Sequence, residues 1–339
     1  MEYLVVGGGP AGLIEAQRLS AIGKEVTLVS PQWGGIMECM GEHYLQSYFN
    51  ELELPGSKFS LRYFMKKNEL SPRACEYISY LRRYAKQLEV TKVTDVLLSA
   101  EFNGEFYSCN FKERGKAALK VKKIIAATGI KPKAVEKNKL YNCKKIRCIE
   151  AYEHFSNISG SCEREQSVVI IGSGNSAFQI ARLAAASGYN THIMAKKYNG
   201  IYPIETVDRF ALRSCSQITI EKIWKSQTNH ENPEISFSVY RDFYEDENEL
   251  SFKIHARDNY CHIAKATIEN LSTPSSFFDE YTRTFRKDSI IIVLAIGMEP
   301  AQSFSIEGGA HYQGSYDNIY WAGSVANYQS VNTMISPRC

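Results

Sequence analysis

The sequence predicts an α/β protein with two parallel-sheet units. Short β-branched runs alternate with amphipathic helical segments, which is the pattern of parallel strands covered by helices. Two of the strand–helix pairs are joined by glycine-rich turns, which begin at Gly7 and Gly172. The chain has 339 residues, which is enough for two domains, and it contains no internal repeat or low-complexity tract.

The first unit is predicted to contain a strand at Glu2–Val6, a helix at Ala11–Ile22 and a second strand at Glu25–Ser30. Apolar residues recur on the helix at the spacing of one face: Leu13, Ala16 and Leu19. Gly23 then ends the helix, so the segment reads as a strand–turn–helix–turn–strand unit.

The first turn, residues 7–12 with the sequence GGGPAG, fits the pattern G-x-G-x-x-G. Gly7 permits the tight turn, Gly9 lets the backbone approach a pyrophosphate, and Gly12 allows the helix to pack closely on the strand. The start of the helix adds free N–H groups and a positive dipole end. Glycine-rich strand–helix turns also occur without a ligand, so this motif alone does not decide between a dinucleotide site and a structural turn.

After this unit we expect a helix at Pro72–Glu89 and a polar, hairpin-like stretch at Val90–Leu119. A strand at Ile124–Ala127 follows and ends in Thr128-Gly129. The polar, lysine-rich stretch Ile130–Cys162 is interpreted as the crossing into a second domain.

The second unit repeats the arrangement, with a strand at Ser167–Ile171, a helix at Ser176–Ser187 and a strand at Asn190–Ala195. Its turn, residues 172–177 with the sequence GSGNSA, matches the variant G-x-G-x-x-A. Two such turns in the same structural context indicate that the chain binds two dinucleotides.

Three further segments complete the prediction. The polar, acidic stretch Gln227–Glu249 is expected to be a surface excursion. A very apolar strand at Ser289–Ala295 runs into Ile296-Gly297, and Asn318–Gly323 is another strand that ends in a glycine turn.

The residues that follow the second strand of each unit indicate which nucleotide its glycine turn binds. An acid that binds ribose is expected about 20 residues past the first glycine. The first unit has Ser30 and Gln32 in this place, which can still hydrogen-bond a ribose. The second unit has Lys196 and Lys197, which suit the 2′-phosphate of NADP, although lysines at a strand end are also commonly just solvated.

These motifs resemble those of the two-dinucleotide-binding flavoproteins, the superfamily of thioredoxin reductases and flavin-containing monooxygenases. The resemblance implies two Rossmann-like domains, with FAD on the first turn and NADPH on the second. It implies that the NADPH domain (133–297) is inserted in the FAD domain (1–132 and 298–339). The implied cofactor-binding residues are Gly7, Gly9, Pro10, Ala11, Gly12, Ser30, Gln32, Gly34, Gly35, Thr128, Gly129, Gly172, Gly174, Asn175, Ser176, Ala177, Lys196, Lys197, Gly297, Gly323 and Ser324.

The family usually has an aspartate after the final glycine, where this chain has Ser324. The sequence also ends at Cys339, which leaves little room for the last helix of the family. One hypothesis is that a partner subunit in a homodimer completes the flavin site.

The resemblance leaves the reaction open, and we favour a small-molecule monooxygenase that acts through a peroxyflavin. Three segments are similar to those of flavin monooxygenases: Asn175-Ser176, Tyr77–Leu88 and Arg147–Phe155. The F-x-G-x-x-x-H fingerprint of some members is absent, and Trp33 precedes Gly34 instead of following the paired glycines.

Two reductase classes are the main alternatives, and a dinucleotide sensor without catalytic activity ranks after them. A disulfide reductase of the thioredoxin type would need a cysteine pair, and the chain has no C-x-x-C. The nearest candidates are Cys143 and Cys148, whose basic neighbours would lower a thiol pKa if they form such a pair, although we favour the alternative that they are two unrelated thiols in a basic linker. A reductase of ferredoxin or another flavoprotein would need a basic docking face, for which Arg62–Lys67 and Arg82-Arg83 are candidates.

Composition excludes several other classes. The 40 basic and 37 acidic residues give a net charge of +3, too balanced to indicate a nucleic-acid or membrane surface. Nine cysteines in a long chain are not typical of a secreted disulfide framework, so a cytoplasmic protein is expected. The seven histidines show no metal-ligand spacing, and no metal is predicted.

Overall fold

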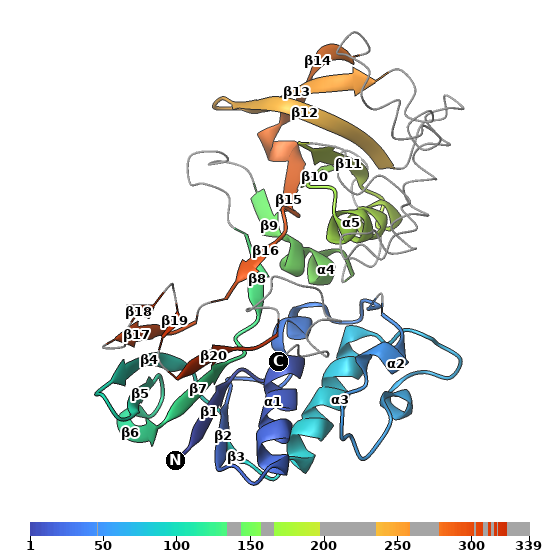
Figure 1. Cartoon of the computed structure of the whole chain (residues 1–339). Coiled ribbons are helices and arrows are strands. Elements are labelled where there is room, and N and C mark those ends of the chain that lie inside the picture. Colours follow the sequence, from blue (N-terminus) through green and yellow to red (C-terminus); the bar gives the residue numbers. More distant parts are fainter. Residues whose placement is uncertain are drawn as a thin grey trace, which may run out of the picture. The chain divides into compact units, whose positions relative to one another are not determined.

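The computed structural model describes residues 1–45, 47–133, 144–156, 166–196, 235–257, 278–301, 303–307, 311–312, 315–316 and 318–323. The chain divides into two compact units. Unit 1 consists of Met1–Lys131 and Met298–Cys339, and unit 2 is the continuous stretch Pro132–Gly297. Figure 1 labels the helices and strands of both units.

Unit 1 is built on a five-stranded sheet in the order β20-β7-β1-β2-β3. Every neighbouring pair in this sheet is parallel. Its strands are β1 (Tyr3–Val6), β2 (Val26–Val29), β3 (Thr91–Val93), β7 (Lys123–Ala126) and β20 (Ile319–Trp321). The predicted first strand, its partner and the strand before Thr128 are thus confirmed.

Helices α1 (Pro10–Ala21) and α3 (Ala74–Gln87) cover one face of this sheet (Figure 1). The core beneath them combines aliphatic residues of α1 with three fully buried tyrosines of α3: Tyr77, Tyr80 and Tyr84. Two of these hydroxyls are used to hold the preceding loop, because Tyr80 accepts the Leu54 N–H (2.7 Å) and Tyr84 donates to the Pro55 carbonyl (2.6 Å).

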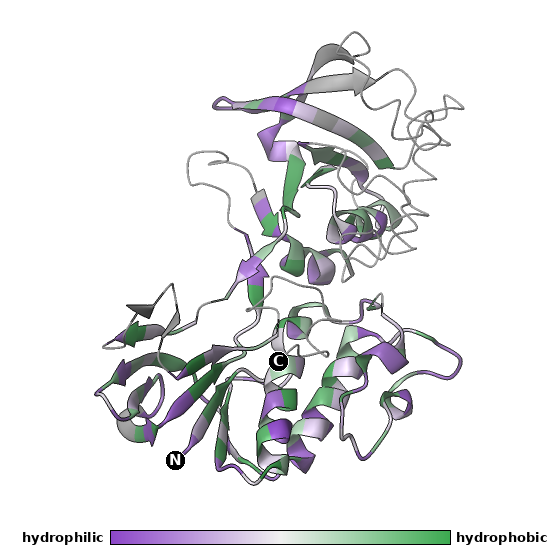
Figure 2. Ribbon diagram, viewed as in Figure 1, coloured by the Kyte–Doolittle hydropathy of each residue, from purple (hydrophilic) through white to green (hydrophobic). Residues whose placement is uncertain are grey.

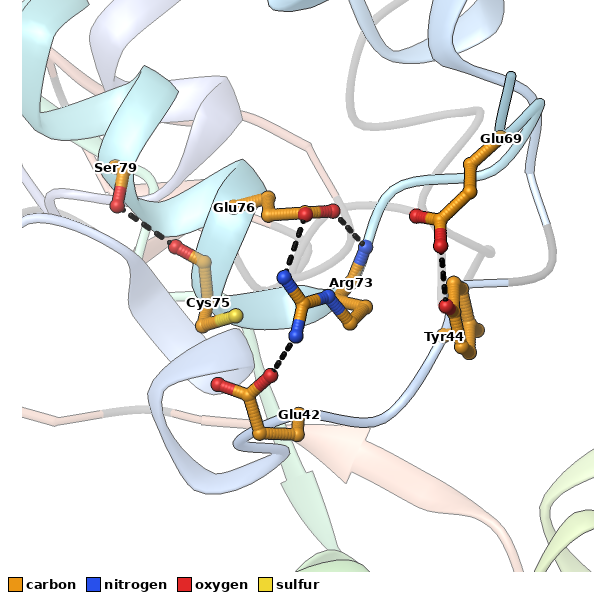
Figure 3. A network of polar contacts seen from close by, with 7 residues as sticks. All are labelled: Glu42, Tyr44, Glu69, Arg73, Cys75, Glu76 and Ser79. Carbon is orange, nitrogen blue, oxygen red and sulfur yellow. Dashed lines mark hydrogen bonds and ion pairs between the residues drawn. The ribbon is translucent and has the colours of Figure 1, made fainter. Parts of the chain in front are cut away.

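Short elements between β2 and α3 line the same side: η1 (Gly35–Cys39), α2 (Phe49–Leu52) and η2 (Leu61–Phe64). A polar network fixes the chain after η1 to the start of α3 (Figure 3). Arg73 pairs with Glu42 and, at 2.7 Å, with Glu76 one turn into the helix. Tyr44, which forms an isolated β-bridge with Arg73, donates its hydroxyl to Glu69 (2.7 Å).

The opposite face of the sheet is covered by the predicted hairpin region. Strands β4 (Leu97–Phe102), β5 (Tyr107–Phe111) and β6 (Gly115–Val121) are antiparallel neighbours, and β17 (Ser305–Glu307) joins β4 in parallel. Their buried side chains pack against Leu4, Val6, Val29 and Val93 of the five-stranded sheet. Unit 1 therefore has three layers: helices, parallel sheet and hairpins.

Two short pairs complete this part of the chain. Strands β8 (Ile130–Pro132) and β16 (Met298–Pro300) form a two-stranded sheet where the chain passes between the two units. Strands β18 (His311–Tyr312) and β19 (Ser315–Tyr316) pair with each other.

Unit 2 contains a seven-stranded sheet in the order β14-β13-β12-β11-β10-β15-β9. From β9 to β12 the strands are parallel, and β12, β13 and β14 are antiparallel. The strands are β9 (Lys144–Arg147), β10 (Ser167–Ile171), β11 (Asn190–Ala195), β12 (Ile235–Glu245), β13 (Glu249–Arg257), β14 (Phe278–Arg286) and β15 (Ile290–Leu294), and η5 (Lys287–Ser289) precedes β15. The helices in the described part of the unit are α4 (Cys148–Ser156) and α5 (Asn175–Ala186).

Hydrophobic residues concentrate on the central strands of each sheet, as Figure 2 shows for β1, β7 and β15. Strand β15 has the sequence IIIVL, and all five residues are buried. A continuous apolar run is typical of a parallel strand that is covered on both faces. Among the described helices, none has the length and hydrophobicity needed to cross a membrane.

The prediction for Gln227–Glu249 was wrong where the structure describes it. Residues 235–245 form β12, and Ile235, Phe237 and Tyr240 are buried. Only the first half, up to Val239, pairs with β11, and the charged second half continues into the hairpin with β13. Of the described acidic residues, Asp242 and Glu245 lie in this second half and Asp246, Glu247 and Glu249 follow it in the hairpin, while the first half packs in the sheet.

A buried histidine lies on the sheet of unit 2. His192 of β11 is only 5% exposed, and its Nδ1 contacts the hydroxyl of Ser236, its register partner on β12. Arg283 of β14 places its Nη2 at 3.2 Å from His192 Nε2. Burial, together with the positive charge of Arg283, lowers the pKa of His192 to about 3. The imidazole is therefore neutral in the folded protein.

We expect His192 to make the protein less stable as the pH falls below about 6.5, the pKa of an unfolded histidine. Between that pH and about 3 the unfolded state binds a proton that the folded state does not, which costs about 1.4 kcal/mol per pH unit. The free energy of urea unfolding should thus fall by about 2 kcal/mol less between pH 7 and pH 5 in His192→Gln than in the wild type. Parallel pH profiles of the two proteins would contradict this assignment.

Candidate functional site

The first glycine turn follows β1 and is crowded by backbone on one side. Gly7 has φ of +126°, and a Cβ on it would lie 2.2 Å from the Ala127 carbonyl oxygen. A Cβ on Gly12 would lie 1.9 Å from the carbonyl oxygen of Gly7. Both contacts are with backbone, which cannot move aside. Glycine is therefore required at the first and third positions of the motif by the packing of β1, β7 and α1.

The second glycine of the motif has different surroundings. The nearest atom to a Cβ on Gly9 would be the Cα of Gly35, at 3.8 Å, an ordinary contact distance. Gly9 is the N-cap of α1, Pro10 follows at the first helical position, and no described side chain caps the helix. The turn thus offers backbone N–H groups, a helix dipole and free space at one point, as a pyrophosphate requires.

Three other segments named from the sequence meet this turn. A Cβ on Gly35 would lie 3.2 Å from the Cα of Gly9, so the Gly34-Gly35 loop faces the turn. Gly323 packs against Ala11, where a Cβ would lie 2.5 Å from the Ala11 Cβ. Thr128 follows Ala127, and its Oγ1 is buried with no hydrogen-bond partner among the described residues. An unsatisfied buried hydroxyl at this position fits a bound polar group.

Ser30 and Gln32 lie against the same turn. Ser30 is buried, and its hydroxyl donates to the Gln32 carbonyl (2.6 Å). A Cβ on Gly8 would lie 2.7 Å from Ser30 Oγ and 2.3 Å from the Gln32 carbonyl oxygen. Ser30 therefore packs the loop onto the turn, and its hydroxyl proton is already used within the loop.

Sequence reasoning missed one acid in this region. Glu38 of η1 accepts hydrogen bonds from Arg82 of α3 at 3.0 Å, and its carboxylate lies where a Cβ on Gly34 would be. Glu38 lies farther along the chain than the position where a ribose-binding acid is expected. Its contact with Arg82 joins residues 44 positions apart, so no local pattern indicates it. The ion pair holds the glycine loop against α3.

The second turn repeats the geometry in unit 2. Gly172 has φ of +128°, and a Cβ on it would lie 2.1 Å from the Ala295 carbonyl oxygen. Gly174 is the N-cap of α5, and a Cβ on it would meet no atom of the described residues within 4 Å. Asn175 and Ser176 begin the helix, and Ala177 is fully buried at the third position of the motif. The second turn thus has the same crowded side and the same open side.

The remaining predicted residues are placed as follows. Lys196 directly follows β11 and is exposed. Gly129 and Gly297 have φ of +77° and +96° at the ends of β7 and β15. Lys197, Ser324 and Cys143 lie outside the described residues, so their suggested roles stay predictions.

The expectation of a lowered thiol pKa at Cys148 was wrong. Cys148 is 3% exposed at the start of α4, and burial raises its pKa. Its basic neighbour Arg147 is engaged by Glu150, with Nε at 2.8 Å from Oε1. The charge of Arg147 still acts to lower the pKa of Cys148, but burial outweighs it and favours the protonated thiol.

The other described cysteines differ in accessibility. Burial raises the pKa of Cys109 to about 12, and burial with a hydrogen bond to Glu42 raises that of Cys75 to about 11. Cys39 is exposed at the end of η1, the element that begins at Gly35. In the described part of the chain, no three histidine, cysteine, aspartate or glutamate side chains are grouped as a metal site would need.

One parallel sheet and one mixed sheet, each with a strand–glycine turn–helix unit, define a two-domain Rossmann-type fold. The sequence model of the pyridine nucleotide-disulphide oxidoreductases matches residues 1–239. The chain belongs to this family, within the two-dinucleotide-binding flavoprotein superfamily, and is a flavin-dependent oxidoreductase. No curated protein matches the sequence.

Solved structures with the same fold include enzymes of different chemistry. Bacillithiol disulfide reductase from Staphylococcus aureus has a TM-score of 0.64 and 16% identity, covering 99% of this chain and 94% of its own. The FAD-bound cadaverine monooxygenase DfoA from Erwinia amylovora has a TM-score of 0.65 and 15% identity, covering 98% and 90%. Ornithine N-hydroxylase from Kutzneria sp. 744, with reduced FAD, NADP⁺ and L-ornithine, has a TM-score of 0.64 and 13% identity, covering 99% and 97%.

Gly9 and Gly174 are the motif glycines at which a Cβ would not be crowded. Replacing either one by alanine should prevent binding of one dinucleotide and leave the other bound. Gly9 and Gly174 have φ of −82° and −84°, which alanine adopts freely, so stability should change by no more than about 1 kcal/mol. The added methyl group would occupy the space that a phosphate needs.

Gly9→Ala should therefore be purified with little flavin. Gly174→Ala should keep its flavin, measured by absorbance after release, but bind NADPH at least about tenfold more weakly, a loss of about 1.4 kcal/mol. Each variant is the control for the other. Normal flavin content in Gly9→Ala, or loss of flavin in Gly174→Ala, would contradict the assignment.

Proposed function

We propose that the chain binds FAD at the first turn and NADPH at the second, and that it is a monooxygenase of a small molecule. The observation that carries the cofactor assignment is the shared geometry of the two turns. Each has a positive-φ glycine locked by a backbone carbonyl and an open N-cap glycine at the start of a helix. Hydride transfer from NADPH to flavin is the chemistry that such a cofactor pair supplies.

Residues of unit 1 are assigned to FAD. The first-turn N–H groups at the start of α1 would hold its pyrophosphate, and Gly35 and Gly323 keep the neighbouring backbone close. The Thr128 hydroxyl would gain the hydrogen-bond partner that it lacks. The structures of DfoA and of the Kutzneria hydroxylase, which contain FAD, support this assignment through the shared fold.

Residues of unit 2 are assigned to NADPH. The N–H groups at the start of α5 would bind the pyrophosphate, as in the first unit. Lys196 lies exposed after β11, where a 2′-phosphate would be read. The NADP⁺ in the Kutzneria enzyme is consistent with this choice of cofactor.

The buried state of Cys148 favours the monooxygenase over a disulfide reductase that uses Cys143 and Cys148. A redox thiol must reach its substrate and ionise near neutral pH. Cys148 is buried and its pKa is raised, so it meets neither requirement. A monooxygenase needs no protein thiol.

Oxygen dependence tests the reaction type. We expect steady-state NADPH oxidation to be faster under air than under nitrogen, with little hydrogen peroxide formed once the substrate is present. Equal rates under both gases, with an added disulfide, ferredoxin or flavoprotein as acceptor, would favour a reductase. The flavin content of the same preparation serves as the control for loaded enzyme.

One observation keeps the reductase as the second candidate. Cys39 is exposed and ends the element that starts at Gly35, beside the first glycine turn. If the enzyme reduces a disulfide, NADPH and a proton would yield NADP⁺ and two thiols. Cys39→Ser should then abolish NADPH-dependent disulfide reduction, while Cys148→Ser should leave it unchanged. Activity that survives Cys39→Ser, or is lost with Cys148→Ser, would contradict this role.

A further inference from the structure

Unit 1 contains an open cavity of about 390 Å³ between the parallel sheet and the hairpin layer. We call it the β2–β3 cavity. The residues that line it are Met1, Thr27, Thr91, Val93, Phe111, Arg114 and Leu119. The volume lies in the range of small-molecule sites, roughly 300 to 1,000 Å³. Val93 and Phe111 are buried members of the surrounding core, so the floor of the cavity is apolar.

Two threonines interrupt this apolar face. Thr27 and Thr91 are register partners on β2 and β3, so their side chains lie side by side on one face of the sheet. The next residues on that face are Val29 and Val93, also register partners. Thr27 is fully buried, and its hydroxyl contacts the thioether of Met1, a weak acceptor. Thr27 and Thr91 each have a hydroxyl where a valine would have a methyl group, so their end of the cavity is polar.

Arg114 adds a positive charge to the same lining. The turn that carries it is fixed by Asp95, whose carboxylate accepts the N–H groups of Val96 (2.7 Å), Glu113 (3.0 Å) and Arg114 (3.2 Å). Burial would raise the pKa of Asp95, but these three hydrogen bonds lower it below its usual value. The backbone of Arg114 is thus anchored, while its guanidinium group remains exposed.

The cavity is separate from the first glycine turn. Thr27 is the second residue of β2 and Thr91 is the first of β3, so both lie toward the amino ends of these parallel strands. The glycine turn and Ser30 follow the carboxyl ends of β1 and β2. A dinucleotide on the turn therefore leaves the β2–β3 cavity available.

We propose that the β2–β3 cavity binds a small carboxylate with an apolar body, such as a medium-chain fatty acid. Val93, Phe111 and Leu119 would contact the apolar body. Arg114 would pair with the carboxylate, and the hydroxyl of Thr91, which is exposed, would donate to one of its oxygens. A guanidinium with a neighbouring hydroxyl suits a carboxylate, because charge-assisted hydrogen bonds are the strong ones.

Calorimetric titration with sodium decanoate, below its micelle concentration, tests the proposal on the flavin-loaded protein. We expect saturable binding of decanoate and at least about tenfold weaker binding of decan-1-ol, which lacks the charge, and of acetate, which lacks the apolar body. Arg114→Gln should weaken decanoate binding at least about tenfold, because it removes the cation. Leu119→Trp should weaken it by filling the cavity.

Lys112→Gln is the matched control, because Lys112 is an exposed cation two residues from Arg114 that does not line the cavity. Arg114→Gln leaves the backbone contact with Asp95 intact, so its far-ultraviolet circular dichroism should match the wild type. The proposal is overturned if decanoate does not bind saturably, or if it binds Arg114→Gln and the wild type equally. Neither outcome depends on NADPH oxidation, so the proposed reaction stands or falls separately.

Discussion

The close approach of one backbone carbonyl to one glycine is the constraint on which both units depend. In unit 1 the Ala127 carbonyl oxygen occupies the place of a side chain at Gly7, and in unit 2 the Ala295 carbonyl oxygen does the same at Gly172. Each contact joins the end of β1 or β10 to the end of its parallel neighbour, β7 or β15. Without it, β1 and β10 could not turn directly into α1 and α5.

The glycines of these two turns serve two different purposes. Gly7, Gly12 and Gly172 are required because protein backbone lies within about 2 Å of the missing Cβ. Gly9 and Gly174 meet no such crowding, and their φ values are ordinary. Packing therefore does not explain glycine at the open positions, whereas a ligand that lies against the backbone does. This contrast within one motif is the strongest physical argument for dinucleotides at both turns.

The reaction depends on features that the fold does not determine. Enzymes that share this architecture include a disulfide reductase and two monooxygenases, all at 13–16% identity. What distinguishes such chemistries is a local matter of which side chains meet the cofactors and whether a thiol is accessible and ionisable. In this chain Cys148 is buried, and Cys39 is exposed at the end of η1, the element whose first residue, Gly35, lies against the first turn.

The sequence alone determined the two strand–turn–helix units and the family, because these depend on residues close together in the chain. Periodicity located β1, α1, β10 and α5, and the glycine spacing located both turns. Other matters needed the tertiary structure. The acidic segment around 240 became part of a sheet, because β13 pairs with its far half and β14 pairs in turn with β13.

Burial raised the pKa of Cys148 where its neighbours in the sequence suggested a lower one, because α4 places it in the interior. The hydrogen bond between Glu38 and Arg82 joins segments that are far apart in the sequence. The same is true of the cavity that Thr27, Thr91 and Arg114 line. Local patterns therefore predicted the elements and their turns. Charge, burial and cavity shape were decided by contacts between residues far apart in the sequence.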